Sequence, residues 1–351
     1  MSARLLFPLR AVVFAALCPR PAAAIPVFAH RYGFTCQQCH TTVPQLNAFG
    51  EQFEEYGFKL PGARAAFPVA VKVNLEYGSD KDPSGLPKAV VDEIELLSGG
   101  AIGENASYFV EQYVTDGGRP GLTRDAWIQL NGEERHARAG QFTLPRPVDP
   151  ESERPTLTHY AVFDQTVGEN TFNFFDPRLG VDAFAGTERG LSGHIAALDA
   201  YDRQTATPRS GIDVMGALSN RTGPLTLTAY RYQGQRNFAV ADRFWRQGYS
   251  AVFLSGRFGA TALLQTGNDT SADGAGLAAR SSGGFLSASY RLSPLLELQT
   301  RYEGTNDDLA GMQRQFVLSA NARVRRNIRF TIEGTQNAGH RTLNLGLLFA
   351  Y

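Results

Sequence analysis

From about residue 66 to the C-terminus, apolar and polar residues alternate along the chain. One face of the last run carries Leu343, Leu345, Leu347, Phe349 and Tyr351. The other face carries Thr342, Asn344, Gly346, Leu348 and Ala350. Of that second set only Leu348 is bulky. Successive side chains of a β-strand point to opposite sides of its sheet, so this period of two predicts strands.

The same alternation, followed back from the C-terminus, predicts about sixteen strands. They are residues 68–77, 89–98, 105–115, 121–130, 135–144, 180–187, 192–201, 210–219, 224–233, 246–257, 260–268, 283–292, 295–304, 314–324, 328–336 and 342–351. The second face of these runs carries mostly charged and small polar residues. A transmembrane strand with lipid on one side and a polar lumen on the other has this pattern, whereas a soluble sandwich hides its apolar face against a second sheet. We therefore expect an antiparallel transmembrane barrel, with a soluble exported β-protein as the alternative.

Connections between the predicted strands alternate between tight and long. The tight ones include residues 131–134, 258–259, 293–294 and 325–327. The long ones include residues 145–179, 202–209, 234–245 and 269–282. With both termini in the periplasm, every tight turn lies on the periplasmic side, as in outer-membrane barrels. The terminal Tyr351, with Phe349 before it, resembles the C-terminal signal that barrel assembly machinery recognises.

Before residue 66 the pattern is helical. Four apolar residues recur at spacings of three and four on one helical face: Leu46, Phe49, Phe53 and Tyr56. Pro44 suits the first turn of such a helix and Gly57 suits its end, and Pro61-Gly62 reads as a linker. The resulting segment, residues 25–64, is too small to enclose a large cofactor by itself, so the remaining chain must help.

Residues 1–24 have the features of a cleavable secretory signal peptide. Arg4 and Arg10 precede a short apolar core at residues 11–17. Residues 22–24 are alanines that suit a cleavage site. The core is too short to span a bilayer, although an N-terminal membrane anchor is the alternative. No later segment is apolar for about 18 residues, so no transmembrane helix is expected.

The composition leaves two cysteines as candidate functional residues in the mature chain. The chain has three cysteines in all, and Cys18 falls in the predicted leader. Cys36 and Cys39 remain, which excludes a disulfide framework and a four-cysteine zinc site. The 34 basic residues equal the 34 acidic residues, so no basic excess exists to bind nucleic acid.

The two cysteines and His40 form a CxxCH motif. Covalent haem attachment needs two thiols that reach the two vinyl groups of one macrocycle and an imidazole that ligates the iron, and this spacing supplies both. A thioredoxin-like redox pair would need a βαβ setting, and half of a zinc site would need further cysteines. We therefore expect one haem c, with Cys36 and Cys39 as thioether sites and His40 as the proximal iron ligand.

The distal iron ligand stays open at this stage. His30 is near the motif in sequence and is the first candidate, although it also suits an ordinary polar position. Met215 is the second candidate, because it falls on the lumen-facing side of the predicted strand 210–219. A five-coordinate iron is the third possibility.

The stretch from Ile25 to Thr41, followed by residues 44–53, resembles the N-terminus of the fused outer-membrane cytochrome–porins. The best-known members of that family are iron(II) oxidases. The resemblance implies a monohaem plug, residues 25–64, in the periplasmic mouth or lumen of a barrel formed by residues 65–351. It implies an outer-membrane location and the same roles for Cys36, Cys39 and His40.

The leading functional hypothesis is an outer-membrane electron carrier. An extracellular reductant such as Fe²⁺ would donate an electron, a periplasmic carrier would accept it, and the activity would be that of an iron(II):cytochrome c oxidoreductase. Besides outer-membrane lipid, the expected partners include the cytochrome c maturation machinery and exclude nucleic acid. The alternatives are a transport porin with a structural or sensory haem, and a soluble periplasmic haem-binding β-protein. The acidic loop 145–179 could attract cations, although a solvated loop is the simpler interpretation.

Overall fold

The computed structural model describes residues 28, 32–42, 45–58, 60, 69–81, 87–132, 134–145, 154–187, 190–200, 211–325 and 327–350. The predicted leader and His30 lie outside these ranges, as do Pro44 and Tyr351. None of the helices in these ranges is long and apolar enough to cross a membrane.

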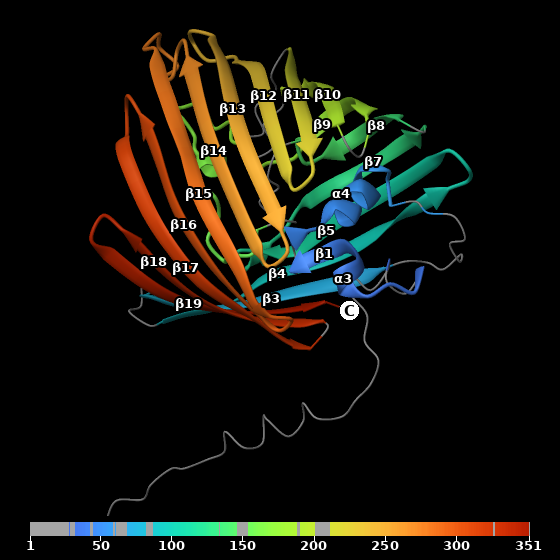
Figure 1. Cartoon of the computed structure of the whole chain (residues 1–351). Coiled ribbons are helices and arrows are strands. Elements are labelled where there is room, and N and C mark those ends of the chain that lie inside the picture. Colours follow the sequence, from blue (N-terminus) through green and yellow to red (C-terminus); the bar gives the residue numbers. More distant parts are fainter. Residues whose placement is uncertain are drawn as a thin grey trace, which may run out of the picture.

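Over the described residues the chain forms a closed barrel of sixteen long antiparallel strands (Figure 1). They are β3 (Ala70–Lys81), β4 (Pro87–Ile102), β5 (Ala106–Asp116), β7 (Thr123–Asn131), β8 (Arg135–Phe142), β9 (Arg178–Gly186), β10 (Gly190–Asp199), β11 (Ile212–Thr222), β12 (Leu225–Arg236), β13 (Asp242–Ser255), β14 (Phe258–Asp269), β15 (Ala279–Ser293), β16 (Leu296–Asp307), β17 (Gly311–Arg325), β18 (Ile328–Asn337) and β19 (His340–Ala350). A two-residue strand, β6 (Arg119–Pro120), pairs with the end of β5. Each long strand pairs with the next, and β19 closes the barrel on β3 with Leu347 opposite Leu75. The predicted antiparallel barrel of about sixteen strands is confirmed.

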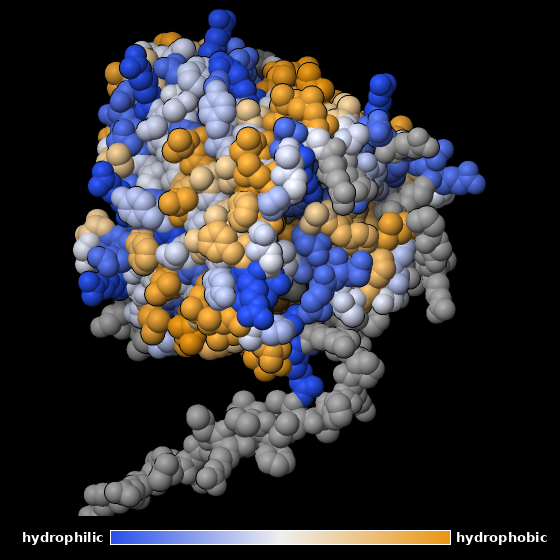
Figure 2. Space-filling view, in the orientation of Figure 1, coloured by the Kyte–Doolittle hydropathy of each residue, from blue (hydrophilic) through white to orange (hydrophobic). Residues whose placement is uncertain are grey.

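The outer wall of the barrel is apolar. In β10, Leu191 and Ile195 are 61% and 64% exposed, whereas Ala196 and Leu198 on the other face are buried. The same alternation exposes Leu264 and Leu286 on neighbouring strands, and hydrophobic side chains spread over the visible wall in Figure 2. A contiguous apolar belt on a closed barrel requires lipid around it. The chain is therefore an outer-membrane β-barrel, and this belt counts against the soluble alternative.

The two ends of the barrel differ in their connections. At one end the strands join through tight turns such as Gly223-Pro224 and Gly256-Arg257, where both glycines have positive φ values of 56° and 59°. The opposite end carries the longer connections after β8, β10 and β14, although β18 and β19 are joined there by only two residues. The predicted alternation of tight and long connections is largely confirmed, and the two ends are called the tight-turn end and the long-loop end below.

The N-terminal segment, here the described residues from Phe28 to Leu60, lies inside the wall. It contains α3 (Cys36–Cys39), the short hairpin β1 (His40–Thr42) and β2 (Gln45–Leu46), and α4 (Ala48–Glu55). The predicted helix is present over Ala48–Glu55, but Gln45 and Leu46, which were expected in its first turn after Pro44, form β2 instead. Figure 1 shows α3 and α4, in blue, surrounded by the barrel strands.

A second segment, residues 154–176, also folds inward and is called the inserted loop. It includes the short helix α5 (Ala161–Asp164). Leu157, Phe163, Phe172 and Phe174 of this loop are buried. The interpretation of the whole connection as a solvated acidic loop is therefore wrong for this part, because carboxylates of the wall satisfy its backbone and draw it inside.

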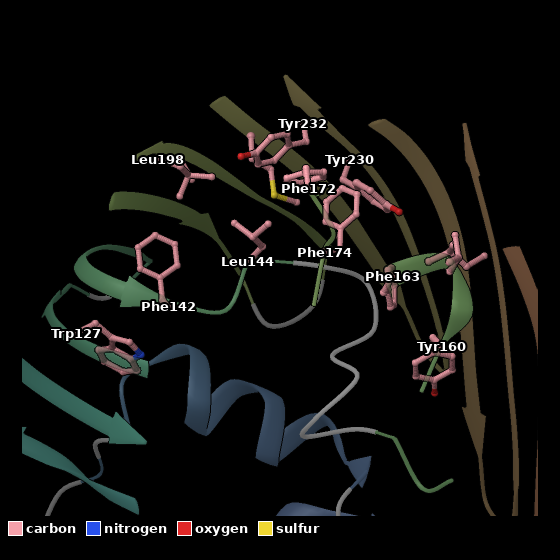
Figure 3. Close-up of a cluster of buried hydrophobic side chains, with 14 of the residues drawn as sticks. Trp127, Phe142, Leu144, Tyr160, Phe163, Phe172, Phe174, Leu198, Tyr230 and Tyr232 are labelled. Carbon is pink, nitrogen blue, oxygen red and sulfur yellow. The ribbon is translucent and has the colours of Figure 1, made fainter. Parts of the chain in front are cut away.

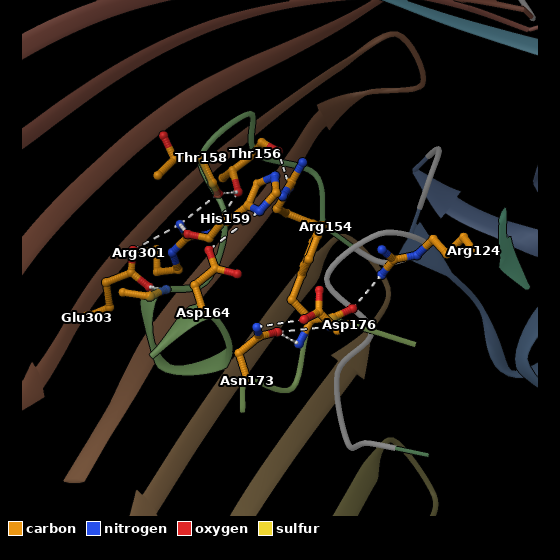
Figure 4. Close-up of polar contacts among 12 residues, drawn as sticks. Arg124, Arg154, Thr156, Thr158, His159, Asp164, Asn173, Asp176, Arg301 and Glu303 are labelled. Carbon is orange, nitrogen blue, oxygen red and sulfur yellow. Dashed lines mark hydrogen bonds and ion pairs between the residues drawn. The ribbon is translucent and has the colours of Figure 1, made fainter. Parts of the chain in front are cut away.

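Side chains of the wall make these contacts, and Figure 4 shows Arg301 and Glu303 among them. Glu333 accepts hydrogen bonds from the backbone nitrogens of Leu157 (2.7 Å) and Thr158 (2.8 Å). Glu303 accepts one from Ala161 (3.0 Å), and Arg301 donates to the carbonyl oxygen of Thr158 (2.9 Å). A buried loop is stable only when its backbone groups have partners, and these strand side chains supply them.

Candidate functional site

A cavity of about 460 Å³ lies at the tight-turn end, between the N-terminal segment and the inner wall. Cys39 and His40 both line it, and His40 is 8% exposed. Its apolar lining includes Phe28, Phe34, Leu46, Phe53, Phe58, Leu97, Phe109, Trp127, Leu144 and Leu348. Its volume falls within the range of sites that enclose cofactors.

Asn47 holds the CxxCH turn against α4. Its side chain accepts from the backbone nitrogen of Gly50 (2.9 Å) and so caps the start of α4. Its side-chain amide nitrogen donates to the carbonyl oxygens of Gln37 and Gln38, both at 3.1 Å. Its backbone nitrogen donates to the carbonyl oxygen of Cys39 (2.8 Å). Asn47 therefore supplies hydrogen-bond partners for backbone groups of α3 and for the first turn of α4.

Gly50 is required at the point where α4 passes the motif. A Cβ atom there would collide with the carbonyl oxygen of Cys39. The absence of a side chain lets the two helices approach closely, which fixes the direction in which the motif faces.

An aromatic cluster joins the segment to the wall. Phe58 stacks on Phe28 with ring centres 4.5 Å apart, and its ring lies 4.9 Å from Phe109 and 6.2 Å from Trp127. Phe53 meets Phe28 edge-on at 5.3 Å. Burying aromatic rings in these arrangements stabilises the segment in the lumen and keeps water from this side of the cavity.

The C-terminal end of α4 is fixed by polar contacts with the wall. The carboxylate of Glu55 lies 2.7 Å from His136 Nε2 and 3.6 Å from His194 Nε2. Gln129 donates to the Glu55 carbonyl oxygen (2.8 Å). Burial raises the pKa of Glu55, but His194, the hydrogen bond from His136 and the Arg138 guanidinium outweigh it and lower that pKa to about 2.

The rest of the lining is strongly charged. Lys72 is paired with Glu95 (2.6 Å), and Arg138 is paired with Asp182 (3.1 Å). Arg291 also faces the cavity. Lys72 and Arg138 are already paired with carboxylates, so Arg291 is the one of these three cations that suits a carboxylate group of a haem. The apolar walls suit the haem ring, so the donor set and lining fit the group that the motif implies.

The structure brings some of the predicted residues together and not others. Cys39 and His40 share the cavity, and Cys36 opens α3 immediately before them. His30 lies outside the described residues. Met215 is fully buried in β11, as its predicted lumen-facing position required, but Ala217 and not Met215 lines the cavity.

Sequence reasoning missed His194. It lines the cavity from β10, and its Nδ1 lies 3.1 Å from Asp182 Oδ2. The sequence does indicate that His194 faces the lumen, because it lies on the face of the strand opposite the exposed Leu191 and Ile195. In the part of the chain that the structure describes, no three His, Cys, Asp or Glu side chains gather into a metal-ion site.

The closed barrel, its apolar belt and the inward-folded loop define a porin-type outer-membrane protein. No family model matches the sequence, and no curated protein matches it either. Solved structures do resemble the fold. An anion-selective porin from Comamonas acidovorans superposes with a TM-score of 0.65 at 14% identity, over 82% of this chain and 99% of that one.

Two further structures are similar. Salmonella typhi OmpF, solved in complex with daunomycin, has a TM-score of 0.65 at 12% identity over 81% of this chain and 97% of that one. The outer-membrane channel DcaP of Acinetobacter baumannii has a TM-score of 0.61 at 13% identity over 84% and 100%. At these identities the resemblance establishes the fold, so the chemistry of the cavity has to be argued from its own residues.

Proposed function

We propose that this outer-membrane barrel carries one covalent haem c in the cavity at its tight-turn end and transfers electrons between an extracellular donor and a periplasmic acceptor. The observation that carries the proposal is that the CxxCH motif places Cys39 and His40 in a cavity enclosed jointly by the N-terminal segment and the barrel. When bound, the haem supplies one-electron redox chemistry.

The residues of the chain have separate tasks in this proposal. Cys36 and Cys39 form the thioether bonds, and His40 binds the iron from one side. The apolar ring of Phe28, Phe58 and Trp127 excludes water, which tunes the potential of the site. The N-terminal segment acts as the plug, and the tight-turn end faces the periplasm.

The buried side chains inside the barrel favour electron transfer over the transport of bulk solutes. A single cluster of buried hydrophobic residues runs from the N-terminal segment through Trp127 and Phe142 to Phe172 and Tyr232. Figure 3 shows the members of this cluster that come from the wall and the inserted loop. Where this apolar cluster occupies the lumen, it opposes the passage of hydrated solutes, because they would lose their water contacts there.

The direct functional test uses the protein purified from outer membranes in detergent. Fe²⁺ and other reductants would be added one at a time, and the reduced haem band would be followed by absorbance. We expect at least one external donor to reduce the site in reconstituted vesicles when added on the long-loop side. The Cys36→Ala/Cys39→Ala double variant is the matched control, because it keeps the barrel and lacks the thioether sites.

A second candidate function is a transport porin whose haem is structural or sensory. The comparisons by themselves favour this candidate, since the similar structures are porins and channels. It predicts clear single-channel conductance in planar bilayers and a haem that no donor reduces. Low conductance together with donor-dependent reduction would exclude it.

A further inference from the structure

We infer that His194 is the second axial ligand of the haem iron, opposite His40, and that Asp182 positions it. The inference rests on the proposed function, because it requires the haem. It concerns a residue on β10, far from the motif in sequence, that lines the same cavity as His40.

The described lining offers few alternatives. Haem iron takes its protein ligands from histidine, methionine, cysteine and tyrosine. Among the described residues that line the cavity, these types are Cys39, His40, Tyr56 and His194. Cys39 is assigned to a thioether and His40 to the proximal position. Tyr56 would have to lose its phenolic proton before it could ligate, whereas a neutral imidazole ligates directly.

The hydrogen bonding of His194 presents the correct nitrogen. Its Nδ1 lies 3.1 Å from Asp182 Oδ2, and a carboxylate only accepts, so the proton sits on Nδ1. Nε2 faces the Glu55 carboxylate at 3.6 Å, so a metal bound at Nε2 would replace this contact. A carboxylate behind a metal-bound histidine is the usual arrangement that orients the ring and raises its basicity.

The wall fixes this arrangement before any ligand binds. Asp182 is itself held by Arg138 Nη2 at 3.1 Å on the adjacent strand. The ring of Phe184 lies 4.9 Å from the His194 ring and limits its rotation. All three supporting residues belong to paired strands β8 and β9, so they form a rigid frame behind the ligand.

His136 supplies a matched control. It also contacts Glu55, at 2.7 Å, but it does not line the cavity. Replacing either histidine removes a contact with Glu55, so only loss of an axial ligand distinguishes the two variants.

The experiment compares purified wild type, His194→Ala, His194→Gln, His136→Ala, His30→Ala and Met215→Leu by absorbance and EPR. Heat-modifiable migration on a gel shows that each barrel has folded. We expect wild type and His136→Ala to be low-spin and six-coordinate. Both His194 variants should keep the covalent haem and become high-spin, and added imidazole should restore the low-spin spectrum. Asp182→Asn should keep the haem and raise its reduction potential, because a less basic imidazole stabilises the ferric state less.

Three results would overturn the assignment. The first is a low-spin spectrum that survives in both His194 variants. The second is its loss in His30→Ala or Met215→Leu instead. The third is a wild-type protein that is already high-spin with haem bound. Absence of any covalent haem from wild type would have a different meaning, because it would refute the proposed function itself.

Discussion

The two segments inside the barrel, the N-terminal segment and the inserted loop, are held by different contacts. The N-terminal segment is held mainly through side chains, by aromatic stacking on Phe109 and Trp127 and by the pairing of Glu55 with His136. The inserted loop also packs aromatic rings on the wall, with the Phe172 ring centre 4.2 Å from that of Tyr232. In addition, its backbone donates to Glu333 and Glu303 on the strands. The N-terminal segment borders a cavity on one side, whereas the inserted loop is buried against the wall by both its backbone and its side chains. The first segment is therefore suited to a site and the second to a barrier.

The largest effect is expected from Glu333→Ala, which would release the inserted loop from the wall. The backbone nitrogens of the buried Leu157 and the half-buried Thr158 would lose their acceptor, at about 1–3 kcal/mol for a buried group. We expect the loop to leave the lumen, with single-channel conductance rising several-fold and with faster protease cleavage between residues 154 and 176. Haem content should not change.

Glu333→Gln is the control for that experiment, because its amide keeps one acceptor oxygen. It should show a smaller rise in conductance than Glu333→Ala. Unchanged conductance in both variants would mean that the inserted loop is not the barrier.

The next largest effect is expected from Gly50→Ala. The added methyl group would collide with the Cys39 carbonyl oxygen and push the motif away from α4, at a cost of about 1–3 kcal/mol. Haem yield per folded barrel, measured by haem staining against total protein, should fall several-fold. Gly334→Ala is a suitable control, since a Cβ there meets nothing nearer than the Thr342 carbonyl oxygen at 3.9 Å. Equal yields in the two variants would refute the proposed role of Gly50.

Substitutions of Asn47 should have a moderate effect on the stability of the N-terminal segment. Asn47→Ala removes the cap of α4, worth about 1 kcal/mol, together with the two bonds to α3. Asn47→Asp keeps the cap and loses only the bonds to α3. Proteolysis of the N-terminal segment should therefore be fastest in Asn47→Ala and intermediate in Asn47→Asp. If both variants matched wild type, the coupling of α3 and α4 through this residue would be refuted.

The smallest effect is expected from Arg221→Ala. Arg221 pairs with Glu51 of α4, and both side chains are 25% exposed, so the contribution is about 0.2–1 kcal/mol. Proteolysis of the segment should accelerate less than in Asn47→Ala, and salt should reduce the difference from wild type. A large, salt-independent effect would show that this pair contributes more than an ordinary exposed ion pair.

The barrel could be predicted from the sequence because each strand carries its own signal. Alternation in β19 is visible within eleven residues, and the tight turns follow from local residues such as Gly223. The motif at Cys36 to His40 is equally local. The sequence does not reveal which distant residues meet. The partners of the inserted loop, Glu303 and Glu333, are 142 to 176 residues away from it, so its burial could not be predicted.

The distal ligand shows the same limit. Nearness in sequence favours His30, and strand phase favours Met215. His194 has the same strand phase. The pairing of β9 with β10 places it beside Asp182, and only the closed barrel places it beside Glu55 of the N-terminal segment. Local pattern therefore fixes the side of a strand, and the register between strands decides which lumen residues share a cavity.

The central claim is that Cys36 and Cys39 hold a haem inside a porin-type barrel, and the mass of the intact, denatured protein tests it most directly. The protein would be purified from the outer membrane of a host that has cytochrome c maturation machinery. The account predicts a mass equal to the processed polypeptide plus one haem, with the addition lost in the Cys36→Ala/Cys39→Ala variant. A wild-type mass equal to the bare polypeptide, from folded barrels in that host, would contradict it.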